Sequence, residues 1–276
     1  MKRLALLAAG LLLAAQLGTA QAQNERLVPA LGALERGDVT QAIDSLKPLA
    51  AGGDSEAQYT LATVLENAPP PLRDLKGAHD WYLGAAEGGH AGAQNNLGAM
   101  HFDGRGALKD FTEAARWYRL AADQGHAIAQ TNLALMLGMG AGVEPNETEM
   151  AKLLLQAAES GVPRAQAQLA RLYLDGEGVP QNATEAAKWF RNAAAQDHED
   201  AQFFLAVMLQ KGIGIGRDLE AAYAWFLRAA EHGHRIAMLE LSKAYELGMG
   251  VAADAEKAKS WRTRAQGKPA PDPAKK

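Results

Sequence analysis

The stretch "AQAQLARLYLDGEGVPQNATEAAKWFRNAAAQDH", residues 165–198, contains the pattern that decides the fold. It opens with an alanine, places Leu169 four residues later, and continues with Gly176, Gly178 and Trp189. The leucine returns every 36 residues without exception, as Leu61, Leu97, Leu133, Leu169, Leu205 and Leu241. Six copies at one period predict a protein built from stacked repeats, in which each copy is one supersecondary unit.

Each copy predicts two helices, which we call helix A and helix B. In the second copy Ala93 and Leu97 lie on one stripe of helix A, and Ala114, Trp117 and Ala121 lie on one stripe of helix B. The small alanines allow the helices to approach closely, and the larger side chains fill the space between them. All five tryptophans share one register, with Leu153 in the copy that lacks one: Trp81, Trp117, Trp189, Trp225 and Trp261.

The glycine-rich turn between the helices raises the question of a phosphate-binding loop. In "KGIGIGRD", residues 211–218, three glycines alternate with other residues. A dinucleotide-binding loop follows a strand and requires G-x-G-x-x-G, whereas here a helix comes first and Arg217 occupies the position of the last glycine. We therefore interpret Gly212 as a left-handed residue that ends helix A. Every copy then supplies a residue that can cap helix B: Asp74, Asp110, Asn146, Asn182, Asp218 and Asp254.

The repeated residues resemble those of a known family, the Sel1-like repeats, which are related to tetratricopeptide repeats. The residues that carry the resemblance in the fourth copy are Ala165, Leu169, Tyr173, Gly176, Gly178, Val179, Ala186, Trp189, Ala193 and Ala194. The resemblance implies an all-α fold, a right-handed α-solenoid of stacked helix-turn-helix repeats with a 36-residue period. It also implies a concave groove lined mainly by the A helices.

The domain organisation follows from the repeats and from the two ends. We expect six Sel1-like repeats within residues 54–266, at about 54–90, 91–126, 127–162, 163–198, 199–234 and 235–266. Residues 23–53 predict a helical pair that caps the N-terminal side, and residues 267–276, rich in proline and lysine, predict a disordered tail. The last copy shows no obvious polar capping helix, so end-to-end association stays open.

The N-terminus has the features of a secretory signal peptide. Lys2 and Arg3 precede an apolar run from Leu4 to Ala15, and residues 20–22 read Ala-Gln-Ala, a typical cleavage site. The run is shorter than the roughly 20 apolar residues that span a bilayer. We expect residues 1–22 to be removed and the protein to be periplasmic, without stable membrane insertion; secretion and a retained anchor are the alternatives.

Composition and motifs argue against several functional classes. The chain has no cysteine, which excludes disulfides, thiol catalysis and cysteine metal sites, and its net charge of −4 disfavours nucleic-acid binding. It contains neither G-x-S-x-G nor H-E-x-x-H. Four histidines share one register but would lie too far apart to hold one metal ion: His90, His126, His198 and His234. We predict no catalytic residues, no metal site and no cofactor.

Candidate binding residues are those that vary between copies on helix A, two positions before or after the core leucine. By resemblance to tetratricopeptide repeats these positions face the groove, where polar members could hydrogen-bond an extended peptide and apolar members could hold an anchor side chain. The candidates are Asn95, Thr131, Leu135, Arg171, Phe203, Val207 and Lys243.

We therefore predict a non-enzymatic periplasmic scaffold or adaptor that holds a partner protein or peptide in its groove. By resemblance it could regulate envelope signalling or cell-wall processes, with peptidoglycan or a cell-wall enzyme as a partner. One alternative is a module that binds peptidoglycan or another glycan. The other is a cell-wall or β-lactam hydrolase, for which the sequence shows no catalytic constellation.

Overall fold

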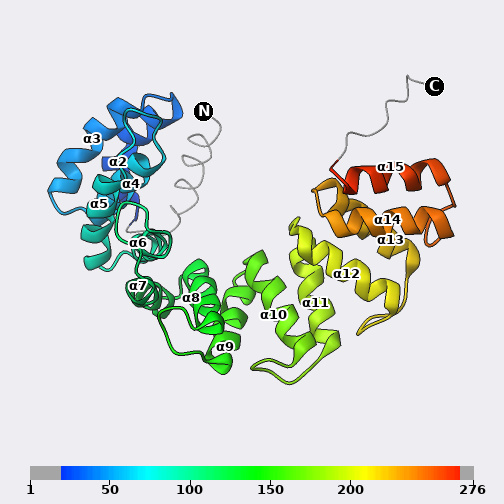
Figure 1. The fold of residues 1–276 in the computed structure, drawn as a ribbon. Coiled ribbons are helices and arrows are strands. Elements are labelled where there is room, and N and C mark those ends of the chain that lie inside the picture. The colour runs from blue at the N-terminus through cyan, green and yellow to red at the C-terminus, as the bar shows by residue number, and fades with distance from the viewer. Residues whose placement is uncertain (1–19, 268–276) are drawn as a thin grey trace. The chain divides into compact units, whose positions relative to one another are not determined.

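The computed structural model describes residues 20–267. The predicted signal peptide, apart from residues 20–22, and the predicted tail, apart from residue 267, lie outside the described residues. Residues 20–267 form fourteen helices and no strand (Figure 1). The helices are α2 (Ala20–Glu35), α3 (Val39–Ala51), α4 (Ser55–Asn67), α5 (Leu75–Glu87), α6 (Ala91–Asp103), α7 (Phe111–Asp123), α8 (Ala127–Met139), α9 (Glu147–Glu159), α10 (Pro163–Asp175), α11 (Ala183–Ala194), α12 (Glu199–Lys211), α13 (Leu219–Glu231), α14 (Arg235–Leu247) and α15 (Ala255–Ala265).

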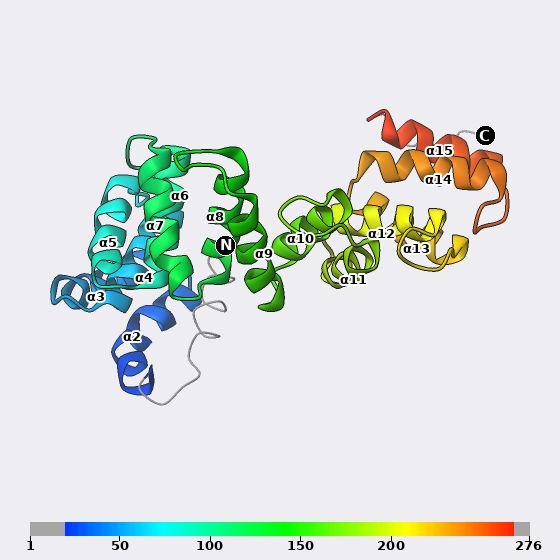
Figure 2. The same cartoon turned by 90° about the horizontal axis from the view of Figure 1, so that it is seen from below.

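The helices fall into two compact units, each described by itself. Unit 1, Met1–Pro145, contains the α2–α3 pair, the A helices α4, α6 and α8, and the B helices α5 and α7. Unit 2, Asn146–Lys276, begins with the B helix α9 and continues with the pairs α10–α11, α12–α13 and α14–α15 (Figure 2). Within each unit every helix packs against the next along the chain. This packing, at a period of 36 residues, confirms the predicted all-α solenoid fold.

The core of each repeat is centred on the recurring leucine of helix A, and in four of the six repeats an aromatic residue of helix B packs with it. All six leucines are at most 1% exposed. The aromatic partner is the residue after the tryptophan register, and it is almost fully buried: Tyr82, Tyr118, Phe190 and Phe226. The tryptophans lie at the edge of the core, and basic side chains cover some of them; the Arg264 guanidinium lies 4.1 Å from the centre of the Trp261 ring.

The first glycine of each turn ends helix A as predicted. Gly176 caps α10 in the left-handed conformation with φ of +77°, and its N–H donates to the carbonyl of Leu172. The same left-handed cap closes every A helix that is followed by a Gly-x-Gly turn: Gly104, Gly140, Gly176, Gly212 and Gly248.

The second glycine of each turn is required by a contact between neighbouring repeats. A Cβ atom on Gly178 would lie 2.2 Å from the carbonyl oxygen of Glu147, the first residue of the preceding B helix. On Gly214 it would lie 2.1 Å from the carbonyl oxygen of Ala183, again the first residue of a B helix. The sequence predicted the turn, but the close approach of two backbones is the reason that no side chain fits there.

The predicted caps of the B helices are all present. The Oδ1 atom of Asn182, for example, accepts from the N–H groups of Thr184 and Glu185 at 3.1 Å each. The side chains that accept hydrogen bonds in this way are Asp74, Asp110, Asn146, Asn182, Asp218 and Asp254.

The histidine register caps the A helices, a role that the sequence analysis did not predict. The Nδ1 atom of His90 accepts from the N–H of Ala93 at 3.0 Å, and His126, His198 and His234 repeat this bond. An Nδ1 atom that accepts a hydrogen bond carries no proton, so in these four caps a proton on the ring lies on Nε2.

A glutamine in the first turn of helix A ties consecutive repeats together. The buried Gln94 donates from Nε2 to the carbonyl of Ala86, near the end of the preceding B helix, at 3.0 Å. The bond satisfies a carbonyl that the helix end leaves free. It recurs from Gln58, Gln130, Gln166 and Gln202 to the carbonyls of Ala50, Ala122, Ala158 and Ala194.

The last helix, α15, closes unit 2 with polar residues. In α11 three positions that pack inward are buried and apolar: Ala187, Phe190 and Ala194. The same register in α15 and at its C-cap holds exposed polar residues: Lys259, Arg262 and Gln266. Helix α15 is therefore a polar capping helix, which corrects the expectation that the last copy lacks one and removes the apolar surface that end-to-end association would use.

The close approach at the second glycine predicts a difference between two alanine variants of one turn. Gly176→Ala should cost about 1–2 kcal/mol, since a left-handed residue gains a Cβ atom whose nearest neighbour, Gln181 Cβ at 3.5 Å, is at an ordinary contact distance. Gly178→Ala should cost about 2–5 kcal/mol, because the same strain adds to a clash with the Glu147 carbonyl. Urea unfolding of both variants measures the difference, and equal losses would contradict the inter-repeat role of the second glycine.

The half-buried cap His126 predicts a loss of stability in acid. Burial lowers the pKa of His126 below its usual value, and the nearby His90 lowers it further. Because the folded pKa lies below the unfolded one, its contribution is complete above about pH 6.5 and decreases as the pH falls through the folded pKa.

The measurement is the urea midpoint of the wild type and of His126→Asn at about pH 7 and about pH 5. Asparagine keeps a capping oxygen without a titrating group. The variant should lose less stability on acidification, and an identical loss in both proteins would refute the assignment.

Candidate functional site

The A helices of each unit present side chains that differ from copy to copy, and these surfaces form the candidate site. No group of three or more His, Cys, Asp or Glu side chains within residues 20–267 is arranged to hold a metal ion. In the same part of the chain no helix has the length and apolar character needed to cross a bilayer. The side chains that the A helices present are amides, aromatic rings and single charges.

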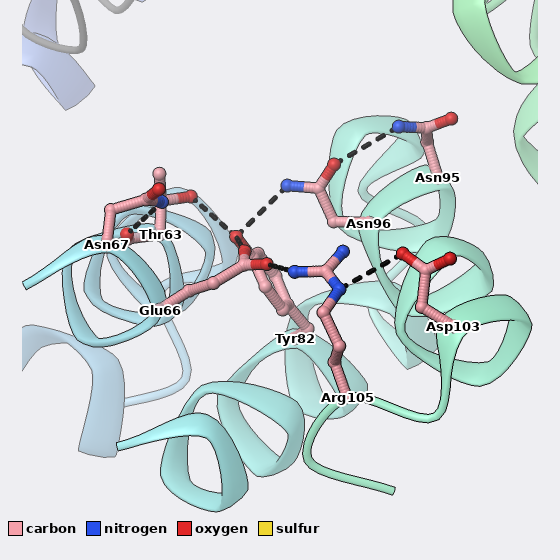
Figure 3. A network of polar contacts seen from close by, with 8 residues as sticks. All are labelled: Thr63, Glu66, Asn67, Tyr82, Asn95, Asn96, Asp103 and Arg105. Carbon is pink, nitrogen blue, oxygen red and sulfur yellow. Dashed lines mark hydrogen bonds and ion pairs between the residues drawn. The ribbon is translucent and has the colours of Figure 1, made fainter. Parts of the chain in front are cut away.

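In unit 1 the surface is organised around the hydroxyl of Tyr82, a residue with no exposed surface (Figure 3). This hydroxyl lies 3.0 Å from Thr63 Oγ1 and donates to Glu66 Oε2 at 2.9 Å, and Asn96 Nδ2 donates to it at 3.0 Å. Burial and the Glu66 carboxylate raise the pKa of Tyr82 well above its ordinary value, so its proton stays in place. The hydroxyl thus joins helices α4, α5 and α6.

Glu66 is itself neutralised from the turn that follows α6. Arg105 donates to Glu66 through Nη1 and to Asp103 through Nε, so one guanidinium joins two carboxylates (Figure 3). Partial burial opposes the charge on Arg105, but the hydrogen bonds to Glu66 and Asp103 outweigh it and raise its pKa. The group is a structural ion-pair network.

Three asparagines continue the network onto the A helices, and we call them the amide track: Asn95, Asn96 and Asn132. Asn95 donates to the Oδ1 of Asn96 at 3.1 Å, and Asn132 donates to the Oδ1 of Asn95 at 3.2 Å. Every bond runs in the same direction, toward Tyr82. The track therefore ends at the Oδ1 atom of Asn132, which makes no hydrogen bond within residues 20–267.

In unit 2 the corresponding positions of helix A are aromatic and pack on buried rings of the B helices. We call the whole group the aromatic cluster: Phe190, Phe203, Phe204, Phe226 and His234. Phe203 stacks on His234 with ring centres 4.4 Å apart and contacts Phe204 edge to face at 5.4 Å. Phe204 in turn stacks on Phe190 at 5.2 Å. Phe203 and Phe204 are half-buried, so the cluster offers rings to solvent on α12.

The stack of Phe203 on His234 has a counterpart four repeats earlier. Tyr59 stacks on His90, also with ring centres 4.4 Å apart, and the Nε2 atom of His90 lies 3.1 Å from Glu56. Burial and the Glu56 carboxylate raise the pKa of Tyr59. In both units the capping histidine supports the aromatic residue that precedes the core leucine by two positions.

The predicted binding residues differ in their exposure. Thr131 is 2% exposed and donates to the carbonyl of Ala127, and Asn95 is 8% exposed within the amide track, so neither leaves much side chain for a partner. Leu135 is half-buried in unit 1.

In unit 2 the predicted residues are more accessible. Phe203 and Val207 are half-buried and Arg171 is exposed. Lys243 is exposed and pairs with Glu240 at 2.7 Å. Of the seven predicted residues, Asn95 enters the amide track and Phe203 enters the aromatic cluster.

The sequence analysis missed Asn96, Asn132 and Phe204. All three occupy the position one residue before the core leucine, next to the predicted position. The signal was available, because this position changes from asparagine in the second and third copies to phenylalanine in the fifth. The tetratricopeptide resemblance points to positions two residues from the core leucine, whereas these three residues lie one residue from it.

The network around Tyr82 predicts the effect of removing one oxygen atom. Tyr82→Phe should destabilise unit 1 by about 1–3 kcal/mol, since Thr63, Glu66 and Asn96 each lose a partner. The ring itself fits, because Phe190 and Phe226 occupy the same register in later copies.

A double-mutant cycle with Asn96→Ala separates the network from local packing. The loss in the double variant should be smaller than the sum of the two single losses, measured by urea unfolding. Additive losses would show that the amide track and the Tyr82 hydroxyl act independently.

Comparison with known families agrees with the repeat geometry. The family model described as Sel1 repeat matches six consecutive segments: residues 55–90, 91–126, 127–162, 163–198, 199–234 and 235–265. A search of curated proteins gave no match. Sel1 repeat proteins generally mediate protein–protein interactions, and the family is typically a non-catalytic scaffold.

Solved structures similar to this chain include two that are about 30% identical to it. A Sel1 repeat protein from Oxalobacter formigenes aligns with a TM-score of 0.77 and 31% identity, over 90% of this chain and 99% of that chain. The protein c5321, a protective antigen of uropathogenic Escherichia coli strains that displays an SLR fold, aligns with a TM-score of 0.77 and 30% identity. That alignment covers 82% of this chain but 48% of c5321, so this chain spans about half its length. With six matched repeats and these relatives, the chain belongs to the Sel1 repeat family.

Proposed function

We propose that this protein is a non-enzymatic scaffold of the periplasm that binds an extended segment of a partner protein along its A helices. The observation that carries the proposal is the contrast between constant and variable positions. The core leucine, the turn glycines and the helix caps repeat from copy to copy, whereas the positions next to the leucine change in chemistry. Constant positions build the scaffold, and variable exposed positions are suited to recognition.

The amide track is suited to contact with a peptide backbone. A side-chain amide offers both donors and an acceptor, as a peptide group does. The track is internally bonded except at Asn132 Oδ1, where a main-chain N–H of a partner has a free acceptor. Because the internal bonds hold the amides in place, binding requires little ordering of side chains.

The aromatic cluster is suited to an apolar anchor. Phe203, Val207 and Leu239 lie on the A helices α12 and α14 and keep part of their apolar surface in solvent, with Leu239 38% exposed. Arg171 on α10 is exposed and forms no ion pair within the described residues, so it is free to meet a partner carboxylate. A partner segment with an apolar residue and an acidic residue would complement unit 2.

The proposed location is supported by the N-terminal pattern of Lys2 and Arg3, the apolar run and the Ala-Gln-Ala site. The absence of cysteine makes the repeats independent of the redox state of the compartment. Fractionation of cells with N-terminal sequencing of the mature protein tests this part, and a cytoplasmic chain that starts at Met1 would refute it.

Site-specific photo-crosslinking in living cells tests the binding surface. The crosslinker is placed at Arg171 on α10 or Phe203 on α12, with the exposed Arg191 on helix B of the same unit as the matched control. We expect a discrete protein adduct, identified by mass spectrometry, at the two A-helix positions and not at Arg191. Equal labelling at all three positions would contradict the proposal.

The identified partner then allows a direct measurement of affinity. The double variant Arg171→Ala with Phe203→Ala should weaken binding by at least about tenfold, the effect of losing anchor residues from an interface. Calorimetric titration with the purified partner measures the change. Unchanged affinity would show that Arg171 and Phe203 do not contribute to binding and would contradict the proposed interface in unit 2. Pelleting with purified sacculi would show whether a glycan is bound instead.

A further inference from the structure

A small apolar pocket lies in unit 2 between helices α9 and α10, outside the amide track and the aromatic cluster. Its volume is about 230 Å³. Among its lining residues are Ala151, Lys152 and Leu155 on α9, Leu169 and Tyr173 on α10, and Val179 in the turn that follows. Typical ligand pockets occupy about 300–1,000 Å³, so this pocket matches a single side chain better than a cofactor.

The other repeats show which group fills this place. The register of Ala151 on helix B faces the register of Tyr173 on the next helix A. In the fifth and sixth copies the pair is Tyr223 and Tyr245, whose hydroxyls lie 2.6 Å apart with ring centres at 5.7 Å. In unit 1 a ring again faces a ring at this register, with a centre-to-centre distance of 5.4 Å between His79 and His101.

The pocket arises because one of the two rings is missing. Ala151 carries only a methyl group, while Tyr173 keeps its ring and is half-buried. Elsewhere an alanine at this register faces a leucine that is almost fully buried, Leu137 at 1% and Leu209 at 7% exposure. The hydroxyl of Tyr173 makes no hydrogen bond within the described residues, whereas that of Tyr245 is bonded to Tyr223.

A positive charge borders the pocket. Lys152 is exposed and forms no ion pair within residues 20–267. At the same register of neighbouring B helices the basic residue is paired: Arg116 with Glu113 at 2.9 Å and Lys188 with Glu185 at 3.2 Å. The pocket therefore combines an apolar interior, a free hydroxyl and an unpaired ammonium group.

We propose that this pocket receives a tyrosine side chain of the partner protein that has a carboxylate beside it. The tyrosine ring takes the place that Tyr223 occupies in the fifth copy, and its hydroxyl bonds to the hydroxyl of Tyr173. The neighbouring carboxylate pairs with Lys152. The inference rests on the proposed function, since it assumes a protein partner, and it adds a second contact that is separate from the amide track and the aromatic cluster.

The test uses 3-(4-hydroxyphenyl)propionate, which joins a phenol ring to a carboxylate, as the probe in ligand-observed NMR titrations of the full chain. The wild type should bind it saturably. Ala151→Tyr, which supplies the ring from within as Tyr223 does, should abolish binding and leave the protein folded with a raised Tm. Binding that persists in Ala151→Tyr, or no saturable binding to the wild type, would overturn the proposal.

A matched pair of lysine variants tests the charge. Lys152→Ala should weaken binding of the propionate by about two- to fivefold, the range of an exposed ion pair, and leave binding of uncharged 4-ethylphenol unchanged. Lys188→Ala, which removes a lysine at the same register, should have no effect. Equal losses in the two variants would contradict the role of Lys152. Crosslinking at Arg171 and Phe203 tests whether a partner protein binds, and the NMR titration tests whether the pocket binds a phenol. A negative result in one experiment is therefore distinguishable from a negative result in the other.

Discussion

The structure depends on one close contact, the approach of the second turn glycine to the first carbonyl of the preceding B helix. A Cβ atom on any of these glycines, from Gly106 to Gly250, would lie within about 2 Å of backbone atoms of the neighbouring repeat. The contact sets how near consecutive repeats come to each other within a unit. The alanines of the core follow from the same constraint, because larger residues would hold the helices apart.

Polar side chains with the same period secure the junctions that this contact creates. The buried glutamines reach back to the end of the previous helix, the histidines cap the A helices, and the Asp and Asn residues cap the B helices. Each bond satisfies a backbone group that a helix end would leave unpaired. The cap formed by His126, whose pKa is lowered by burial, adds a dependence on pH, because a protonated ring nitrogen cannot accept.

Function then depends on the positions that these constraints leave free. Beside the core leucine the residues pass from amides in unit 1 to aromatic rings in unit 2, and on helix B the change from Tyr223 to Ala151 opens a pocket of about 230 Å³. In each case the backbone stays the same and the side chain alone decides what the surface can bind. Because the backbone is shared, the residues at one register in different copies show which side chain a given copy lacks.

The sequence by itself determined the helical repeat, its period, the left-handed glycines and the caps of the B helices. These features are local or periodic, so that helix propensity, capping and self-comparison are sufficient to predict them. It also placed Phe203 and Arg171 among the candidate binding residues.

The tertiary structure alone decided which variable positions are accessible and which are buried. Thr131 and Asn95 share the register of Phe203, yet they are almost fully buried. The polar character of the face that α15 presents likewise depends on which of its residues are exposed in the folded protein. The physical reason is that exposure, close approach and the filling of a pocket depend on which side chains face each other across two helices. The order of residues along the chain does not specify that pairing.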